Sequence, residues 1–373
     1  MISDYKISRR NDFQDLKNNL SKDSIYSDDD AIVCEGDSLE ILKSIPKNSI
    51  SLILIDPPYH STKKKNIKND TAFSTDDEFI TWINDFSKEW LRILKPNGSL
   101  YLFCSSKMSA KLEVCLSERF NVLSHVVWSK PNEPGFDGWK GKMKKESLRQ
   151  WYAHSERILF LEPAVEGNLG RSCFAKFLRE QRLKSGLSGH QLTEYTGAYG
   201  KVNHGGAVSN WETGRNVPSK EQYQKICKAF LETGKIKVLP PYEDVIRPFN
   251  VNKEVEFTDV WDFYSVRPYK GKHPAEKPLD MLEHCIQSSS YEEDIVLDCF
   301  AGSGSTAVSA LLNNRKTISV ELDNDWALAI KKRLEKFKDD ELTQKVSKEL
   351  IMKRTKAFIK TEAKEKVMTL FNQ

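Results

Sequence analysis

Hydrophobic residues along the chain fall into short apolar runs separated by segments with helical spacing. Residues 50–55 form an apolar run that ends abruptly at Asp56-Pro57-Pro58-Tyr59. Such a run without alternation is typical of a parallel strand that is buried on both faces. Similar runs predict strands at 31–34, 99–104, 121–128 and 157–161, and helical spacing predicts helices at 39–45, 77–94 and 110–117.

The pattern changes after residue 163. Residues 172–232 predict four short helices without any strand, and residues 233–272 form a connector that contains prolines and aromatic residues. Strands are then expected again at 295–300 and 317–322, with a helix at 278–288 and another that ends near 312. Residues 1–30 are polar and indicate a loose leader or an edge helix.

These patterns predict an α/β fold in which one sheet carries helices on both faces. The sheet is built from two stretches, 31–165 and 273–335. An all-α insertion at 170–235 separates them, and a basic helical tail at 336–373 follows.

Composition narrows the class of protein only slightly. Apolar residues make up 39% and charged residues 29%, as in an ordinary soluble protein, and no apolar run is long enough to span a membrane. The polar N-terminus does not have the features of a secretory signal. The seven cysteines are scattered, which argues against a disulfide framework and favours the cytoplasm, and no metal-ligand spacing is visible.

The distribution of charge is more informative than the net charge of +4. Lys and Arg outnumber Asp and Glu between residues 170 and 238, and basic clusters occur at 63–65 and 140–145. Uneven basic charge indicates a polyanionic partner such as nucleic acid. Solvated lysine-rich surfaces would account for the same pattern, so the charge alone decides nothing.

A glycine-rich turn follows the predicted strand at 295–300. The segment Asp298-Cys299-Phe300-Ala301-Gly302-Ser303-Gly304 leads from that strand into a helix, and Glu321 ends the next strand. Glycine permits a sharp turn and close approach to a ligand, and an acidic residue at the next strand end can accept hydrogen bonds from both ribose hydroxyls. The turn alone suits NAD-type cofactors, S-adenosylmethionine or a purely structural role. Asp298 favours the methyl donor, because a carboxylate can pair with its ammonium group.

Asp56-Pro57-Pro58-Tyr59 indicates the chemistry. It follows a parallel strand, where open α/β sheets bind substrates. Prolines fix φ, so the Pro57 carbonyl and the Asp56 carboxylate can together accept both protons of an exocyclic NH₂ group, while Tyr59 offers a face for stacking a base. A rigid structural turn is the alternative, but its chance combination with a cofactor turn is improbable.

Taken together, these motifs resemble the amino-group DNA methyltransferases of the class in which the catalytic motif precedes the cofactor motif. His273-Pro274-Ala275-Glu276-Lys277-Pro278-Leu279 resembles the segment that closes the methionine side of the pocket, and Glu35-Gly36-Asp37-Ser38 a segment that contacts the adenine ring. Segments 128–132 and 154–160 match as well. The resemblance covers about 31–165 and 273–330.

This resemblance implies a Rossmann-like methyltransferase fold and S-adenosylmethionine as cofactor. It implies that the target base is flipped out of duplex DNA and that its nitrogen attacks the methyl group directly. The catalytic residues would be Asp56, Pro57, Pro58 and Tyr59. The cofactor-binding residues would be Asp37, Lys277, Asp298, Phe300, Ala301, Gly302, Gly304, Ser305, Thr306 and Glu321.

The all-α insertion resembles repressor-type helix-turn-helix domains over roughly sixty residues. The match implies a salt bridge between Arg182 and Glu212 and a recognition helix within 203–211 that enters the major groove. Gly205 and Gly206 depart from the pattern, because such domains usually carry base-reading side chains there. Candidate DNA contacts are Asn203, His204, Ser209, Asn210 and Arg215. A helical spacer or a dimer contact remains the alternative.

Three functions therefore stay open: site-specific methylation of adenine N6, which we favour, methylation of cytosine N4, and DNA-binding regulation by an inactive methyltransferase domain. Asp56 favours adenine as the target base, because the cytosine-N4 methyltransferases of the resembling class more often carry Ser at this position. RNA or protein acceptors are weaker candidates.

Double-stranded DNA is the expected partner, a homodimer is compatible with the family, and any cognate nuclease would be a separate chain. The tail either touches DNA phosphates or is a solvated helix.

Overall fold

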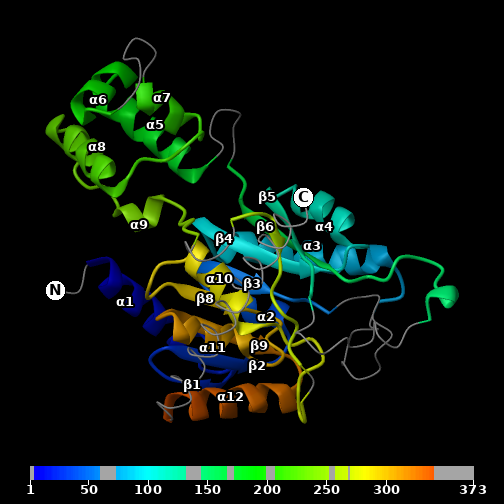
Figure 1. Cartoon of the computed structure of the whole chain (residues 1–373). Helices are drawn as coiled ribbons and strands as arrows, with labels where there is room; N and C mark the ends of the chain where they lie inside the picture. Colours follow the sequence, from blue (N-terminus) through cyan, green and yellow to red (C-terminus); the bar gives the residue numbers. More distant parts are fainter. Residues whose placement is uncertain are drawn as a thin grey trace, which may run out of the picture.

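A nine-stranded mixed sheet forms the centre of the protein. The computed structural model describes residues 4–58, 73–131, 144–165, 172–198, 206–251, 257–267 and 269–339. The strand order is β1-β2-β9-β8-β3-β4-β6-β5-β7, and the sheet runs through the middle of Figure 1. The strands are β1 (Ser24–Ser27), β2 (Ala31–Glu35), β3 (Ile50–Ile55), β4 (Leu94–Cys104), β5 (Phe120–Trp128), β6 (Glu156–Pro163), β7 (Val260–Trp261), β8 (Ile295–Asp298) and β9 (Lys316–Glu321).

Strands from both sequence stretches meet at the centre of this sheet. β8 lies between β3 and β9 and is parallel to both, and β4 is parallel to β3 on the other side. In the register of β3 and β8, Leu52 pairs with Val296 and Ile53 with Leu297. The turns that follow these two strands therefore lie side by side at the carboxyl edge, where α/β sheets bind ligands.

Helices cover both faces of the sheet, as the apolar runs predicted. One face packs against α1 (Asp4–Asn19), α2 (Ser38–Leu42), α3 (Asp76–Ile93) and α4 (Ser109–Leu116). The other face packs against α10 (Leu279–Ser289), α11 (Ser305–Leu312) and α12 (Asn324–Asp339). Strand β3 does not alternate between apolar and polar residues, because both of its faces are buried. Ile53 packs on the face that carries α1–α4, whereas Leu52 and Leu54 pack on the opposite face.

The helical insertion has a hydrophobic core of its own. Helices α5 (Cys173–Ser185), α6 (Gly189–Thr196), α7 (Gly206–Glu212) and α8 (Lys220–Glu232) surround Leu178, Leu192, Trp211 and Phe230, all of which are buried. Ser188 and Ser219 begin α6 and α8 with capping boxes. The short helix α9 (Tyr242–Val245) joins this unit to the sheet, and the unit stands apart from the sheet in Figure 1. We call α5–α8 the helical unit.

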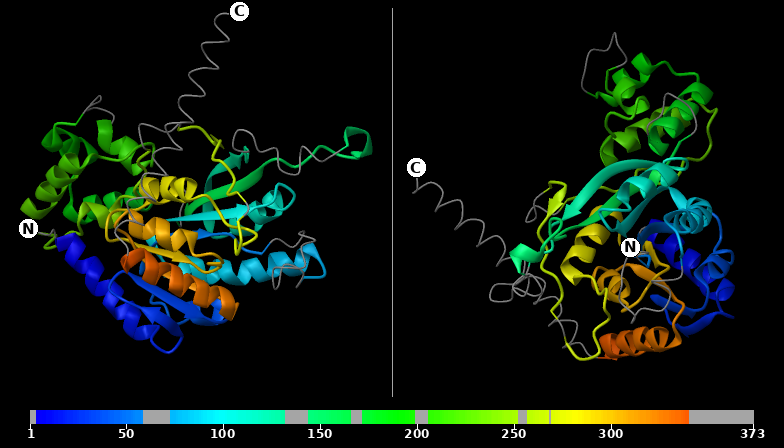
Figure 2. Two further views of the ribbon diagram at one scale, coloured as in Figure 1. Left: turned by 60° about the horizontal axis from the view of Figure 1, so that its bottom comes forward. Right: turned by 90° about the vertical axis from the view of Figure 1, so that its right-hand side faces the viewer.

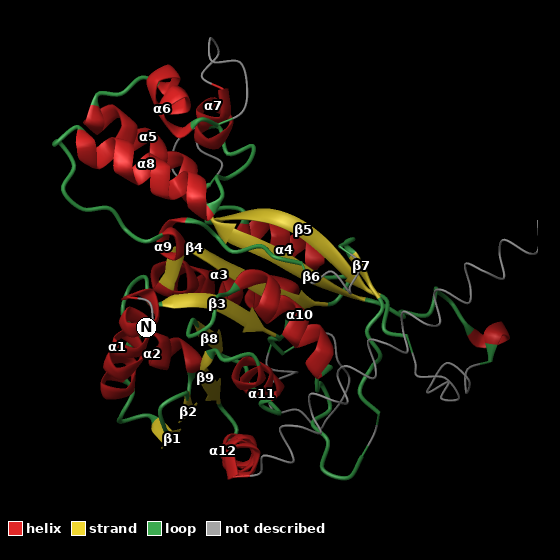
Figure 3. Ribbon diagram, turned by 60° about the vertical axis from the view of Figure 1, so that its left-hand side comes forward, coloured by secondary structure: helices red, strands yellow, loops and turns green. Residues whose placement is uncertain are grey.

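The helical unit and the carboxyl edge of β3 lie at opposite ends of the strands. β6 is antiparallel to β4, with Cys104 beside Arg157 and Leu100 beside Leu161, so β6 carries the chain away from that edge. At the far end, the Asn97 side chain near the start of β4 donates hydrogen bonds to the Glu243 and Ile246 carbonyls (2.8 and 3.1 Å). Figure 3 shows the unit beyond this far end of the sheet.

The start of β4 differs from the sequence prediction, and the two alternatives for the N-terminal residues are resolved. Residues 95–98 lie outside the strand predicted at 99–104, but they belong to β4, which begins at Leu94. Leu94 pairs with Ile50 and Ser99 with Leu52, so the extra residues are accommodated by an irregularity in the ladder, where Pro96 is tolerated. The N-terminal leader is an ordered helix, α1, because the apolar face of Phe13, Leu16 and Leu20 packs into the core.

Candidate active site

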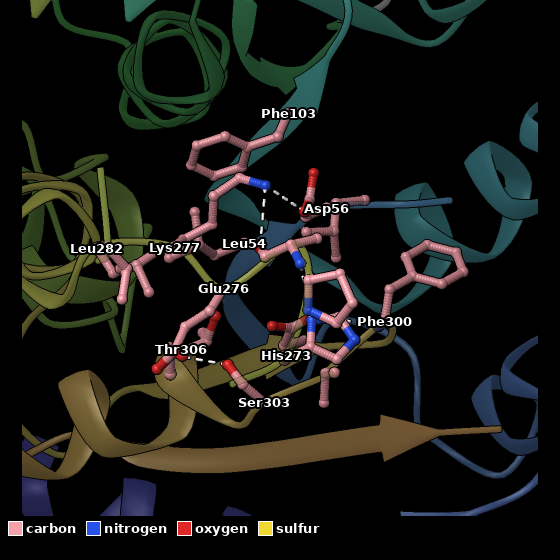
Figure 4. Close-up of a pocket in the computed structure, with 18 of the residues that line it drawn as sticks. Leu54, Asp56, Phe103, His273, Glu276, Lys277, Leu282, Phe300, Ser303 and Thr306 are labelled. Atoms are coloured by element: carbon pink, nitrogen blue, oxygen red, sulfur yellow. Dashed lines mark hydrogen bonds and ion pairs between the residues drawn. The ribbon is translucent and has the colours of Figure 1, made fainter. Parts of the chain in front are cut away.

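A cavity of about 360 Å³ opens at the carboxyl edge, between the turns that follow β3 and β8. Its walls come from both sequence stretches (Figure 4). The β3 side supplies Asp56, Pro57 and Pro58. The β8 side supplies Asp298, Phe300, Ala301, Gly302, Ser303, Ser305 and Thr306, together with Glu321 from β9. The structure thus brings most of the predicted catalytic and cofactor-binding residues into one cavity.

The glycine turn is held in a conformation that suits close ligand approach. Gly302 and Gly304 have φ of +49° and +74°, values that favour glycine. A Cβ atom on Gly302 would lie 3.0 Å from the His273 ring. The Phe300 ring anchors the turn by packing against Trp82 and Phe86 of α3, with ring centroids 5.4 and 5.1 Å apart.

Glu321 is fixed at the end of β9. The Gly302 N–H donates to one carboxylate oxygen (2.7 Å), and the Asp323 N–H donates to the other (2.9 Å). Burial raises the pKa of Glu321 above its usual value. The bonds orient the carboxylate toward the cavity, where ribose hydroxyls can donate to its remaining lone pairs.

Asp298 is buried at the base of the turn, with 5% of its surface exposed. Its carboxylate accepts a hydrogen bond from the Phe300 N–H (3.0 Å). Burial raises its pKa to about 7, which reflects the cost of an isolated negative charge in this position. A cationic ligand group beside Asp298 would lower that cost.

Lys277 lies across the cavity from the glycine turn and forms an ion pair with Asp56. Its ammonium also lies 3.8 Å from Glu156 and 5.2 Å from the centre of the Phe103 ring. Burial lowers the pKa of Lys277, but Asp56 and Glu156 outweigh burial and raise it overall. The family resemblance implies that Lys277 binds the cofactor, and that role stays a prediction; the sequence contains no signal for its pairing with Asp56.

Further residues line the cavity that sequence analysis had not singled out. Glu156 begins β6, and its carboxylate pairs with Lys130 at 2.5 Å. The ring of His273 packs edge-on against Trp326, and burial and nearby Lys277 lower the pKa of His273 to about 4, so it is neutral near pH 7. These residues belong to the matched segments 128–132, 154–160 and 273–279, and that match was the available signal.

Other predicted site residues lie elsewhere. Asp37 caps α2, accepting hydrogen bonds from the Leu39 and Glu40 N–H groups (2.8 and 3.2 Å). Gly304 is the residue before α11 and supports the turn from outside the cavity lining. Tyr59, Asn203 and His204 lie outside the described residues. The predicted salt bridge between Arg182 and Glu212 is present, and it is bidentate, with contacts of 2.5 and 3.0 Å.

The cavity fits a cationic nucleoside better than a dinucleotide. Five carboxylates line it (Asp56, Glu156, Glu276, Asp298 and Glu321) against three lysines (Lys130, Lys272 and Lys277). A pyrophosphate would be repelled by this set, whereas the ammonium and sulfonium of S-adenosylmethionine would be attracted. Within the described ranges, no cluster of His, Cys, Asp and Glu suits a metal ion. Nor does any helix there have the length and apolarity that a membrane span requires.

Comparisons with known proteins agree with this chemistry. Residues 50–332 match the N6_N4_Mtase family, described as DNA methylase. The chain is 27% identical over 299 residues to the DNA adenine methyltransferase YhdJ of Escherichia coli (strain K12), covering 79% of each chain. It is 24% identical over 326 residues to the type II methyltransferase M2.LlaDCHI of Lactococcus lactis subsp. cremoris, covering 83% of this chain and 91% of that one.

A solved structure supports the fold. The PvuII DNA methyltransferase (cytosine-N4-specific) superimposes with a TM-score of 0.50 at 17% sequence identity, covering 90% of this chain and 95% of that one. This likeness concerns the arrangement of the sheet and helices. Because the family match spans most of the chain and includes both turns of the cavity, the protein belongs to the N6/N4 DNA methylase family, with S-adenosylmethionine as its cofactor.

Proposed function

We propose that the protein methylates the N6 amine of adenine in duplex DNA at a specific site. The observation that carries this proposal is the position of Asp56 and Pro57 at the end of β3, across one cavity from the glycine turn. An amine held by these two residues would face the methyl donor. Proximity and orientation of the two reactants are then provided by the fold itself.

The residues of the chain would act by holding and orienting the two reactants. Asp298, Glu321 and the turn at Gly302 would hold the cofactor, which supplies an electrophilic methyl group. Asp56 and the Pro57 carbonyl would accept the two protons of the target amine and so aim its nitrogen at that methyl group. Lys277 electrostatically favours the carboxylate form of Asp56, which is the form that accepts hydrogen bonds. The proton lost from nitrogen would pass first to Asp56.

The target base would enter the cavity by flipping out of the duplex. The carboxylate of Asp56 is only 16% exposed, so a base stacked within a helix could not reach it. Tyr59 would stack on the flipped base, as the resemblance implies. The basic stretches of the surface would hold the phosphates on either side.

Adenine is favoured over cytosine by the identity of residue 56. Asp at this position is associated with the adenine enzymes of the resemblance, and YhdJ, which is named a DNA adenine methyltransferase, aligns over 79% of this chain. Cytosine N4 is the second candidate, because the same hydrogen-bond acceptors suit its amine. The fold of the cytosine-N4-specific PvuII enzyme matches this one, so the fold does not separate the two bases.

We further propose that the helical unit is a repressor-like helix-turn-helix that binds DNA. Ser209 and Arg215 are exposed, Asn210 is half-buried, and the Arg182–Glu212 salt bridge links α5 to α7. Gly206 begins α7 with φ of +50°. The recognition helix would therefore start at the second glycine of the pair Gly205-Gly206. Because the unit lies at the far end of the strands, the bases it reads would be separated from the target base.

Single-molecule sequencing of DNA from a methylation-deficient host that expresses the chain tests this function. N6-methyladenine at one short motif is the expected result. N4-methylcytosine would keep the mechanism and correct the base. A soluble protein that binds S-adenosylmethionine but leaves DNA unmodified would contradict the proposal and favour a DNA-binding regulator.

A further inference from the structure

Residues 144–155, which lead into β6, project from the rim of the cavity. We call residues 144–155 the arm; it includes a short 3-10 helix, η2 (Lys145–Ser147). In Figure 2 the arm extends well beyond the sheet, with η2 at the right-hand end of the left view. Lys130 follows β5, Glu156 begins β6, and both line the cavity. The arm is therefore attached directly at the cavity mouth.

The side chains of the arm are unusual for a solvent-exposed segment. Trp151 has 96% of its surface exposed and Tyr152 has 40%. Lys144, Lys145 and Arg149 are also exposed, against a single acidic residue, Glu146. A large aromatic side chain left in water contributes nothing to the core, so its presence points to a partner. Interleaved aromatic and basic residues suit nucleic acid, where rings stack on bases and cations contact phosphates.

Among the described residues, the hydrogen bonds of 144–149 have partners within the arm. The Ser147 and Leu148 N–H groups donate to the Lys144 and Lys145 carbonyls (3.1 and 3.2 Å). Arg149 donates to the carbonyls of Glu146 and Leu148 (3.4 and 3.2 Å). The local shape is thus set by the arm itself, and its exposed side chains are available to a partner that approaches the cavity.

The direction of β6 separates the arm from the helical unit. Glu156 and Pro163 mark the two ends of β6, and eight residues of extended chain span about 26 Å. The arm precedes Glu156 at the cavity end, whereas the helical unit follows Pro163 at the other end. Of the two, the arm is therefore the one attached at the cavity, and Figure 3 shows the helical unit beyond the far end of the sheet.

We propose that the arm binds the target duplex beside the cavity, with Trp151 stacking on a base next to the target and Lys144, Lys145 and Arg149 contacting phosphates. The proposal rests on the proposed function, because it takes DNA as the occupant. Charge complementarity and the attachment of the arm to the cavity rim support this choice. The contacts would bring the duplex to Asp56 without help from the helical unit.

The test uses the full-length protein and three variants: Trp151→Ala, Trp151→Phe, and Phe257→Ala as a matched control. Phe257 is 85% exposed and lies outside the cavity lining; it precedes β7, which pairs with Val127 and Trp128 at the end of β5. Transfer of tritiated methyl groups to genomic DNA from a methylation-free host gives KM for DNA without knowledge of the motif. Trp151→Ala should raise this KM about tenfold with unchanged affinity for S-adenosylmethionine. Trp151→Phe should restore most of the loss, and Phe257→Ala should behave as wild type.

A second variant tests the phosphate contacts. In a Lys144→Ala/Lys145→Ala double variant, the salt dependence of binding to random-sequence duplexes should weaken by about two in log–log slope. A Trp151→Ala variant with KM for DNA within twofold of wild type would overturn the proposal. So would a change of oligomeric state in sedimentation without a change in DNA affinity, because the arm would then contact a second copy. If the wild type fails to methylate DNA, duplex binding still tests the arm separately.

Discussion

The Lys277 ammonium forms an ion pair with the Asp56 carboxylate, although the two residues lie 221 positions apart in the sequence. Asp56 follows β3, and Lys277 lies in the segment before α10, which packs against β3. The pair therefore links the segment that would bind the amine to the segment that would close the cofactor pocket. Both partners are largely shielded from solvent, with side-chain exposures of 16% and 9%.

Replacing Lys277 by Met should damage both stability and turnover. Removing one partner of a buried ion pair leaves a charge without compensation, which typically costs about 3 kcal/mol or more. We expect a lower free energy of unfolding in chemical denaturation and a fall in kcat of at least about tenfold, because Asp56 would lose the cation that favours its carboxylate form. Lys277→Arg, which keeps the charge, should retain more of both. A Lys277→Met enzyme with wild-type kcat would show that the pair is only structural.

Asp56→Ala should abolish methyl transfer while leaving cofactor binding nearly intact. The substitution removes one of the two acceptors for the amine, whereas Asp298 and Glu321 on the other side of the cavity are unchanged. Isothermal titration with S-adenosylmethionine and tritium transfer to DNA measure the two properties separately. Retained turnover would refute the role proposed for Asp56.

Gly302→Val should weaken binding of S-adenosylmethionine by at least about tenfold, since it combines backbone strain at φ +49° with a clash against His273 at 3.0 Å. Gly197→Ala is a suitable control for strain alone. Gly197 also has positive φ, at +62°, but a Cβ there would meet nothing within 4 Å, and it lies in the helical unit. Titration calorimetry of both variants separates strain from blockage. Equal affinities in Gly302→Val and wild type would show that the cofactor binds elsewhere.

Affinity for S-adenosylmethionine should rise with pH as Asp298 ionises. Burial raises its pKa to about 7 in the folded protein. If only the ionised form pairs with the ligand ammonium, affinity should increase roughly fivefold between pH 6 and pH 7 and level off above about pH 8. The stability of the ligand-free protein changes in the opposite sense, because the folded state holds a proton that the unfolded state has lost. The contribution of Asp298 to the free energy of unfolding therefore falls as pH rises from about 4 to 7. Asp298→Asn should bind weakly and remove the pH dependence; an unchanged pH profile would contradict the assignment.

Local sequence patterns predicted the central strands and the two turns well, because the features that define them are local. The apolar run at 50–55 indicates a strand that is buried throughout, and the glycines at 302 and 304 indicate positive φ angles. Two features of the site depend on which strands become neighbours: the pairing of Lys277 with Asp56, and the position of Glu156 at the cavity. A local sequence pattern carries no information about strand neighbours. The position of the helical unit has the same origin. Because β6 runs antiparallel, an insertion after it is carried to the end of the sheet away from the cavity.

The position of the helical unit, far from the cavity, leads to a specific prediction about its role. Alanine at Asn210 and Arg215 should weaken DNA binding and shift site choice, since both residues lie at or just after α7, and Arg215 is exposed. The methyl-transfer rate on DNA at saturating concentration should stay close to wild type, because the unit lies far from Asp56. Electrophoretic mobility shifts and sequencing of methylated sites measure the two effects. A lowered kcat with unchanged DNA affinity would mean that the unit communicates with the cavity instead. If affinity, site choice and kcat are all unchanged, the unit is a spacer or a contact between copies of the chain.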